Sequence, residues 1–388
     1  MDGFLLARTD QVVRTTGARE RFTEVDAAAA SLRAGRVPLI VGALAFDPAR
    51  GGVLTAPQSA TFTPGRWQTD GTLAELPSSR IIRENPSPAA HMSRVARLIG
   101  SIDAGRISKV VAARSVTVEA DTQVDPELLV SHLVRRHPNA NVFAVDLYDS
   151  DLGNSTLVGA SPEVLVSRHG NAVRLRPLAG TAPRRKDPIA DRAEADGLLS
   201  STKNQHEHSF VIDWIRERLG PVCADLTIPD RPILLSTPEV WHLETPIHGV
   251  LRDSATTALD VAALLHPTPA VCGTPTEVAL ATIADVEGDR RFYGGAVGWC
   301  NANGDGDWIV AIRCAELAGD GRTLEAYAGG GIVAGSDPRS ELDETTTKLG
   351  TLLGALGVRL DDTSKAGAAA GDTLTEAMQE RRNVGEPR

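Results

Sequence analysis

The chain has 388 residues, of which 42% are hydrophobic and 23% are charged, an ordinary composition for a globular protein with one or two cores. Its formal net charge of −10 argues against a nucleic-acid-binding surface, because phosphate binding needs a basic stripe. The apolar runs are too short for a membrane span, and no secretory signal pattern stands at the N-terminus. The four cysteines lack metal-finger spacing, so we expect reduced thiols in a cytoplasmic protein with no membrane or nucleic-acid partner.

The first 85 residues are rich in Gly, Pro and Thr, and only Leu39 to Phe46 has the apolar pattern of a clear strand. Apolar residues at helical spacing then predict an amphipathic helix from about Met92 to Ile102, which ends at Gly105. We expect residues 1–85 to be integrated into one fold with a larger domain over residues 86–360.

The middle of the chain alternates between strand and helix patterns. A strand surrounds Lys109, and a short helix over Glu127 to Arg136 leads to a strand over Asn141 to Tyr148. Residues 156–180 have the short apolar runs and the turn of a hairpin or meander. One long helix is expected over about Ile189 to Leu219, because Gly220 and Pro221 follow it.

Strands separated by glycine-rich turns are predicted again near the end of the chain, over Gly294 to Asn301, Trp308 to Ala318 and Thr323 to Tyr327. A last helix is predicted to begin at Pro338, with Asp337 as its N-cap, and to stop at Gly357.

The composition of residues 361–388, which is polar and rich in Ala and Gly, predicts a disordered tail. Strands and helices elsewhere do not alternate regularly as β-α-β units. This pattern predicts an α+β fold of antiparallel sheets covered by helices.

Lys109 is the most informative residue, because it lies in an otherwise apolar strand. Strand alternation predicts that it points the same way as Ile107, Val111 and Ala113. A buried ammonium is costly unless it is paired or loses its proton, and a lysine that is partly neutral near pH 7 can act as a general base. The alternative is an edge-strand lysine that reaches solvent, which the residue alone would favour.

Acidic residues on two predicted helices are candidate metal ligands. Glu207 lies at the edge of an apolar helix face, and Glu341, Glu344 and Lys348 line one face of the last helix. Carboxylates that converge from separate helices would suit Mg²⁺, a hard ion that prefers oxygen ligands. The alternatives are a solvated glutamate at Glu207 and a surface salt-bridge ladder on the last helix.

Two more charged residues stand beside apolar stretches. Glu163 follows Pro162 between two predicted strands, and burial against apolar neighbours would raise its pKa and allow it to act as a general acid. Arg313 interrupts an apolar strand and would present an inward guanidinium to a carboxylate. The alternatives are an exposed glutamate that begins a strand and an arginine in a cross-strand ion pair.

Taken in order, these segments resemble the chorismate-utilising enzymes, and among them the isochorismate synthases most closely. The resemblance covers about Pro86 to Gly357 and implies two stacked antiparallel β-sheets flanked by helices, as in anthranilate synthase component I. Each segment alone is weak evidence for the family, but the whole set in this order is specific for it. The set consists of Lys109–Arg114, Gly159–Glu163, Arg176–Thr181, Lys203–His208, His242–Thr245, His266–Gly273, Tyr293–Gly298, Gly329–Ser336 and Glu341–Lys348.

The resemblance implies a Mg²⁺-dependent conversion of chorismate to isochorismate, in which water adds at C2 and the C4 hydroxyl leaves. It implies that Lys109 is the general base and Glu163 the general acid. Glu207 and Glu344, with Glu341 nearby, would hold Mg²⁺. The implied substrate-binding residues are Arg313, Tyr293, Lys348, His242, Ala270, Gly329, Gly331 and Thr181.

Two positions separate this chain from relatives that use ammonia. Those enzymes typically carry Gln where Lys109 stands, and aminodeoxychorismate synthases have a nucleophilic lysine where Ala179 stands. Both differences favour water as the nucleophile, so we expect no glutamine amidotransferase subunit. The resemblance also implies a monomer. A salicylate synthase, which also eliminates pyruvate, and a non-catalytic chorismate-binding relative are the alternatives. The pathway, menaquinone or siderophore biosynthesis, stays open.

Overall fold

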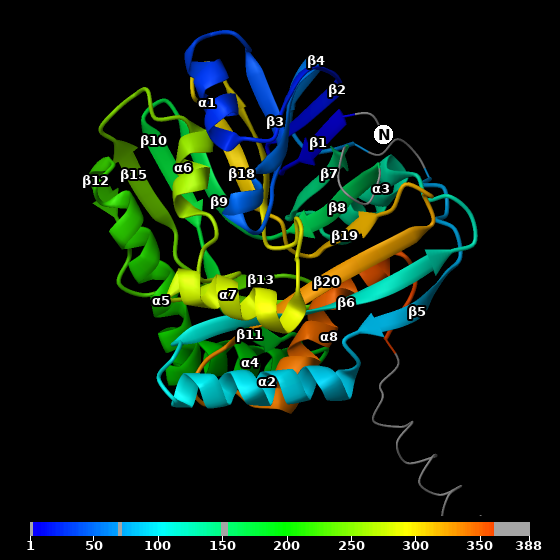
Figure 1. Cartoon of the computed structure of the whole chain (residues 1–388). Coiled ribbons are helices and arrows are strands. Elements are labelled where there is room, and N and C mark those ends of the chain that lie inside the picture. The colour runs from blue at the N-terminus through cyan, green and yellow to red at the C-terminus, as the bar shows by residue number, and fades with distance from the viewer. Residues whose placement is uncertain (1–2, 69–71, 149–153, 361–388) are drawn as a thin grey trace, which may run out of the picture. The chain divides into compact units, whose positions relative to one another are not determined.

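The computed structural model of the chain describes residues 3–68, 72–148 and 154–360 (Figure 1). The predicted disordered tail over residues 361–388 lies outside these residues. Among the described residues, no helix is both long and apolar enough to span a membrane.

The described residues form eight α-helices, one short 3₁₀ helix (Pro48–Arg50) and twenty strands. The α-helices are α1 (Val25–Arg33), α2 (Pro88–Asp103), α3 (Pro126–Arg136), α4 (Pro188–Ser200), α5 (Thr202–Leu219), α6 (Ala258–Leu265), α7 (Thr276–Glu287) and α8 (Pro338–Ala355). The first ten strands are β1 (Gly3–Ala7), β2 (Gln11–Phe22), β3 (Leu39–Leu44), β4 (Gly52–Pro64), β5 (Ser79–Asn85), β6 (Lys109–Ala120), β7 (Asn141–Leu147), β8 (Ser155–Ser161), β9 (Val164–His169) and β10 (Ala172–Arg176). The others are β11 (Leu178–Pro183), β12 (Cys223–Thr227), β13 (Ile233–Ser236), β14 (Val240–Glu244), β15 (Ile247–Leu251), β16 (Gly273–Thr274), β17 (Ala296–Asn301), β18 (Gly306–Val310), β19 (Cys314–Leu317) and β20 (Thr323–Ile332).

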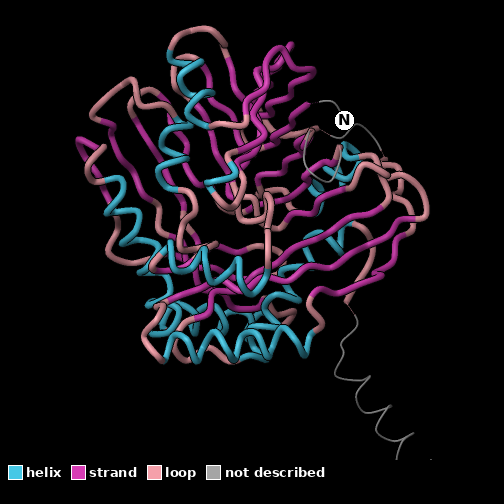
Figure 2. Tube along the Cα trace, viewed as in Figure 1, coloured by secondary structure: helices cyan, strands magenta, loops and turns pink. Residues whose placement is uncertain are grey.

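Seventeen strands share one antiparallel hydrogen-bonded network, and β11, β14 and β13 form a separate small sheet. Along the network the strands follow the order β5-β6-β20-β19-β8-β7-β1-β2-β4-β3-β17-β18-β9-β10-β15-β12, and the short β16 pairs with the start of β6. The pairing of β1 with β2 joins two layers, the run from β5 to β1 and the run from β2 to β12. Figure 2 shows strands running through the middle of the molecule and several helices along its lower side.

The two layers stack on a shared apolar core. Phe4 of β1 and Phe143 of β7 belong to the same buried cluster as Val41 of β3, Val297 of β17 and Ile309 of β18. Because neighbouring side chains of a strand point to opposite faces, these residues mark the inner face of each layer. The predicted arrangement of two stacked antiparallel sheets flanked by helices is therefore confirmed.

Helices cover the outer faces of the layers. Leu32 of α1, Ile215 of α5 and Leu259 of α6 pack in one cluster with residues of β3, β9 and β10. Val95 of α2 and Ile283 of α7 pack in another cluster with residues of β6 and β20. Figure 1 shows α2 and α8 on one side of the β6–β20 pair and α7 near its other side. The predicted N-cap of α8 is also confirmed, because the Asp337 side chain accepts a hydrogen bond from Ser340 N.

The prediction of a single long helix over Ile189 to Leu219 is wrong, because the chain forms α4 and α5 with Ser201 between them. Ser201 has an extended backbone, with φ −69° and ψ 112°, and its hydroxyl accepts a hydrogen bond from Asn204 N at 3.3 Å. A serine in this conformation caps a new helix, so the first helix has to end before it.

The prediction of one strand over Trp308 to Ala318 is also wrong, since β18 ends at Val310 and β19 begins at Cys314. Arg313 has a φ of 52°, in the left-handed region that non-glycine residues rarely adopt. The chain changes layers at this break, because β18 pairs with β17 and β9 whereas β19 pairs with β20 and β8.

Residues 1–85 hold more structure than the single clear strand that their sequence indicates. They contain β1 to β5 and α1. The outer halves of β2 and β4 are exposed, and their Thr, Arg and Gln side chains hide the apolar alternation by which a strand is recognised.

Candidate active site

Two strands and two helices bring the predicted base, Lys109, together with the predicted metal-binding residues. β6 begins at Lys109, and β20 runs beside it so that Gly329, Gly330 and Gly331 pair with the residues that follow Lys109. Glu207 comes from α5. The last helix, α8, contributes Glu341, Glu344 and Lys348.

Gly330 and Gly331 of β20 have no side chain, which leaves room for the nearby acidic side chains. A Cβ atom at Gly331 would lie 2.0 Å from Glu207 Oε1, and one at Gly330 would lie 3.0 Å from Glu341 Oε2 and 3.5 Å from Glu344 Oε1. Any larger residue at position 331 would therefore displace a carboxylate. The three carboxylates, from two helices far apart in the sequence, converge over one short piece of strand.

Each of the three carboxylates is paired with a lysine. The Nζ–Oε1 distances are 3.1 Å for Lys109–Glu207, 2.9 Å for Lys203–Glu341 and 2.6 Å for Lys348–Glu344. Glu207 is 8% exposed and Glu341 3% exposed, so neither is the solvated surface glutamate of the alternative interpretations. Burial, together with repulsion from Glu344, raises the pKa of Glu341 to about 7.

Lys203 is not among the predicted site residues, although its spacing from Glu207 could have indicated it. Lys203 stands four residues before Glu207, so the two side chains share a face of α5. Its ammonium bridges α5 to Glu341 of α8.

Lys109 is fully buried, so the alternative of a lysine that reaches solvent is wrong. Its Nζ makes no hydrogen bond within the described residues, and Glu207 is its ion-pair partner. Val111 lines the same pocket as Glu207, as strand alternation predicts. Ile107 is a correction: it precedes β6 and packs instead in the cluster of Val110 and other residues of the opposite face.

Glu163 lies between β8 and β9 and is 3% exposed. Its Oε1 accepts a hydrogen bond from Leu178 N at 3.4 Å, and its own amide donates to Ser161 Oγ at 3.2 Å. Burial raises the pKa of its carboxyl to about 7, against the opposing effects of that hydrogen bond and of nearby cations such as Lys109. Glu163 is thus a buried carboxyl rather than an exposed one, and it is partly protonated at neutral pH.

Arg313 projects into the site from the break between β18 and β19. Its guanidinium donates to His242 Nε2 at 3.0 Å and to Thr351 Oγ1 at 3.2 Å. Burial and the charge of Arg313 lower the pKa of His242 well below its ordinary value, so the imidazole is neutral and can accept this bond. His242 Nδ1 lies 3.2 Å from both Gly180 O and Thr181 Oγ1.

The alternative interpretation of Arg313, a cross-strand ion pair, is wrong, because within the described residues no carboxylate lies within 4 Å of its guanidinium. Arg313 is 4% exposed, and its charge is therefore available to an anionic ligand. Thr351, which helps to hold it, was not foreseen. It lies one helical turn after Lys348 on α8, a spacing that could have indicated it.

A small cavity of about 60 Å³ joins these groups. All but three of the predicted site residues line it, namely Glu163, Thr181, Glu207, His242, Ala270, Tyr293, Arg313, Gly329, Gly331 and Lys348. Lys109 and Glu344 adjoin it through their ion pairs with Glu207 and Lys348, and Glu341 lies beside Glu344 above Gly330. The structure therefore brings together residues that span more than 230 positions of the sequence.

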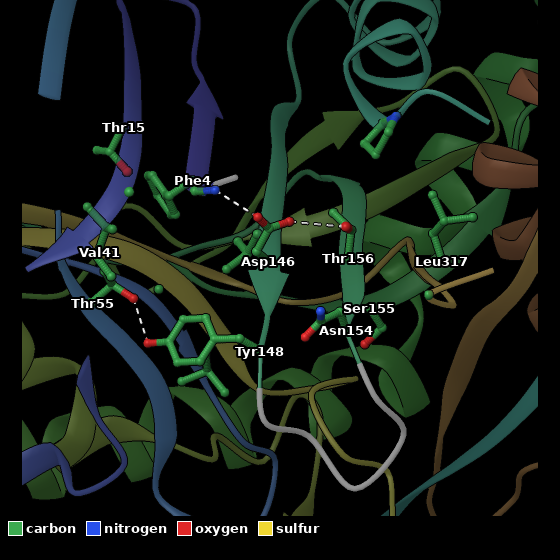
Figure 3. Close-up of a pocket in the computed structure, with 18 of the residues that line it drawn as sticks. Phe4, Thr15, Val41, Thr55, Asp146, Tyr148, Asn154, Ser155, Thr156 and Leu317 are labelled. Carbon is green, nitrogen blue, oxygen red and sulfur yellow. Dashed lines mark hydrogen bonds between the residues drawn. The ribbon is translucent and has the colours of Figure 1, made fainter. Parts of the chain in front are cut away.

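A larger cavity of about 420 Å³ lies elsewhere, among β1, β2, β7 and β8 (Figure 3). Figure 3 shows Asp146 bonded to the β1 backbone and to Thr156, and Tyr148 bonded to Thr55. None of the predicted site residues lines this cavity.

The carboxylates suit a divalent cation by their chemistry. Mg²⁺ takes oxygen ligands, often from one or two carboxylates, and completes its shell with water and substrate. Within the described residues, no three acidic, His or Cys side chains are arranged as a ready-made metal site. Glu207, Glu341 and Glu344 supply carboxylate oxygens, so the chemistry of these side chains fits such an ion.

Comparison with known proteins identifies the family to which the chain belongs. Residues 61–357 match the family model described as chorismate binding enzyme. A Mycobacterium tuberculosis protein provisionally named isochorismate synthase MenF is 49% identical over 347 residues, which cover 88% of this chain and 92% of that protein.

Two solved structures are similar in sequence as well as fold. One is the provisionally named 2,3-dihydroxybenzoate-specific isochorismate synthase DhbC of Bacillus anthracis, with a TM-score of 0.85, 38% identity, and coverage of 92% of this chain and 96% of that one. The other is MenF, the menaquinone-specific isochorismate synthase of Escherichia coli, with a TM-score of 0.80, 26% identity, and coverage of 92% and 89%. The predicted resemblance is confirmed, and this chain belongs to the chorismate-binding enzyme family.

Proposed function

We propose that this protein converts chorismate to isochorismate, by adding water at C2 of the ring and removing the C4 hydroxyl. One observation carries the proposal: a buried lysine and a buried, partly protonated carboxyl adjoin one pocket that also holds cations for an anionic substrate. The reaction needs a base to activate water and an acid to protonate the departing hydroxyl.

Lys109 is the proposed base. Its Nζ has no hydrogen-bond partner within the described residues, and the pairing with Glu207 fixes its position at the edge of the pocket. Glu163 is the proposed acid, since a pKa of about 7 keeps a proton on its carboxyl for part of the time at neutral pH.

The substrate carries two carboxylates, and the pocket offers cations to both. We assign the enolpyruvyl carboxylate to Arg313, whose guanidinium is buried and held by His242 and Thr351, with Tyr293 beside it. Lys348 donates to Gly329 O at 3.0 Å and faces the ring side of the pocket. Thr181, Ala270 and the backbone of Gly329 and Gly331 complete the wall.

Glu207 and Glu344, with Glu341 nearby, are the residues that would hold Mg²⁺. The ion would supply positive charge for the ring carboxylate. Glu207 and Glu344 are now paired with Lys109 and Lys348, so binding of the ion requires that these lysines share their carboxylates with it.

The test is to incubate the purified protein with chorismate, with and without Mg²⁺, and to separate the products by chromatography. Isochorismate formed only with Mg²⁺ supports the proposal, and chorismate recovered unchanged by folded protein would overturn it. Release of pyruvate would identify a salicylate synthase instead. Calorimetric binding of chorismate without any product would identify a non-catalytic relative.

The pH dependence is a second test. A general acid works in its protonated form, so kcat/KM should fall as the pH rises through about 7, the pKa of Glu163. A rate that is constant from pH 6 to 9 would remove Glu163 from the proposed role.

A further inference from the structure

A buried ion pair outside the pocket joins the end of α7 to the turn after it. Arg290 Nε donates to Glu287 Oε2 at 2.7 Å, and Nη2 donates to Oε1 at 2.8 Å. The two side chains are only 3% and 7% exposed. Two buried charges are costly even when they are paired, so the fold has to gain something else from them.

The remaining hydrogen bonds of the pair reach the two segments on either side of it. Arg290 donates from Nη1 to Val271 O at 2.8 Å and from Nη2 to Val111 O at 2.7 Å. Glu287 Oε1 accepts from Ala113 N at 2.7 Å. Val111 and Ala113 belong to the strand that begins with Lys109, and Val271 follows Ala270 in the pocket wall.

Arg290 also contacts a third element of the pocket. Its guanidinium lies 5.9 Å from the centroid of the Tyr293 ring and 4.7 Å from that of Phe46. Its carbonyl accepts a hydrogen bond from Tyr293 N at 3.0 Å. The side chain of Arg290 is thus bonded to the strand of the proposed base and to the loop that holds Ala270, and its backbone is bonded to Tyr293.

We propose that Glu287 and Arg290 are positioning residues, which fix the spacing between the Lys109 strand and the 270–273 loop across the pocket. Neither residue lines the pocket, so neither contacts the substrate. The inference rests on the proposed function for its kinetic consequence. A displacement of about 1 Å in a catalytic group can lower a rate by about 100-fold, so a loosened pair would act on turnover from a distance.

The decisive variant is Arg290→Lys, which keeps the charge beside Glu287 but lacks the planar fork that pairs with both carboxylate oxygens and also reaches two carbonyls. Arg168 offers a matched control. It is 2% exposed and donates to Asn303 O at 3.0 Å, to Ser254 O at 2.8 Å and to Asp305 Oδ1 at 3.1 Å, all away from the pocket. Arg168→Lys therefore removes a similarly buried guanidinium without changing any contact of the candidate active site.

With each variant measured per folded molecule, Arg290→Lys should lower kcat by about 10- to 100-fold. The KM for chorismate should change much less, because the substrate contacts remain. Arg168→Lys should lower the melting temperature while kcat stays within about twofold of the starting protein. Equal kcat for the two variants would show that the Glu287–Arg290 pair is merely structural, and would overturn the inference.

Hydrogen exchange gives a readout that does not depend on turnover. Val111 N donates to Cys272 O at 2.7 Å, between the two segments that Arg290 joins. Amides of residues 107–115 and 266–274 should exchange faster in Arg290→Lys than in the starting protein or Arg168→Lys. Unchanged exchange would overturn the inference even if the protein proved inactive on chorismate. If Arg290→Lys fails to fold, Glu287→Gln tests the same link, since its amide oxygen can still accept from Ala113 N.

Discussion

Two of the cavities of this protein, the one drawn in Figure 3 and the candidate active site, differ in a way that volume alone would misjudge. The larger, of about 420 Å³, is lined by backbone and by side chains such as Thr55 and Tyr148 that bond one another. The smaller, of about 60 Å³, is filled by its own charged groups. It contains Glu163, whose pKa burial raises to about 7, and His242, whose pKa burial lowers.

In this pair of cavities, buried titratable groups rather than empty volume mark the candidate active site. A fold gains nothing in stability by burying an unpaired carboxyl, so such a group persists where chemistry requires it. The carboxylate that lines the larger cavity, Asp146, instead accepts hydrogen bonds from Gly3 N and Thr156 Oγ1 (Figure 3). Substitutions at the small cavity can therefore be set against matched ones elsewhere in the fold.

Loss of the acid or the base is expected to have the largest effect. Lys109→Ala and Glu163→Gln should each lower kcat by about 10²- to 10⁴-fold, because each removes a general catalyst. Thr55→Val, in the larger cavity, should leave kcat within about twofold. Steady-state kinetics with chorismate measure these effects. A strong loss of kcat in Thr55→Val would show that activity depends on the larger cavity, contrary to the prediction.

Glu163 should lower the stability of the folded protein at high pH. The pKa of Glu163 is about 7 when folded and 4.5 when unfolded, so the folded state binds more protons and stability falls as the pH rises from about 4.5 to about 7. Glu163→Gln removes this cost, and should raise the free energy of unfolding by up to about 3 kcal/mol at pH 8 but not at pH 4. Denaturant titrations at both pH values test this.

The control for that experiment is Glu217→Gln on the exposed side of α5. Its stability relative to the starting protein should differ little between the two pH values. A Glu163→Gln variant that loses stability at pH 8 would show that the carboxylate is satisfied in the fold, contrary to its role as an acid.

A methyl group added beside the carboxylates should have a smaller effect. The Cβ of Gly331→Ala would lie 2.0 Å from Glu207 Oε1, so Glu207 has to move away from Lys109. We expect a loss of about 10- to 100-fold in activity and a weaker response to added Mg²⁺, as for other changes behind a metal site. Gly197→Ala is the control, because its Cβ would meet no atom within 4 Å. Equal activity of the two variants would contradict the crowding of Glu207 that we infer.

Much of the site could be predicted because single residues violated a local rule. Lys109 in an apolar strand and Glu163 between two apolar strands each stood out, and both are buried as expected. The faces of α5 and α8 followed from helical spacing. That their carboxylates converge did not follow, since convergence depends on how two helices meet over Gly330 and Gly331.

Other features escaped because their sequence looks ordinary. Glu287 and Arg290 are three residues apart and resemble a surface helix pair, yet they are buried by segments near residues 111 and 271. The left-handed backbone of Arg313 results from a change of layers, which strand periodicity cannot reveal. Ser201 divides a helix that the apolar pattern alone continues. Long-range packing decided each case.

The smallest effect is expected for a substitution in the larger cavity, at Thr15. Thr15 is 3% exposed, and its hydroxyl has no hydrogen-bond partner within the described residues. Thr15→Val keeps the shape and removes that polar atom, so it should leave activity unchanged and stabilise the fold by about 1 kcal/mol or less. Thermal unfolding and steady-state kinetics measure both. Destabilisation with a loss of activity would show that the hydroxyl serves a ligand, and would make the larger cavity a functional site in its own right.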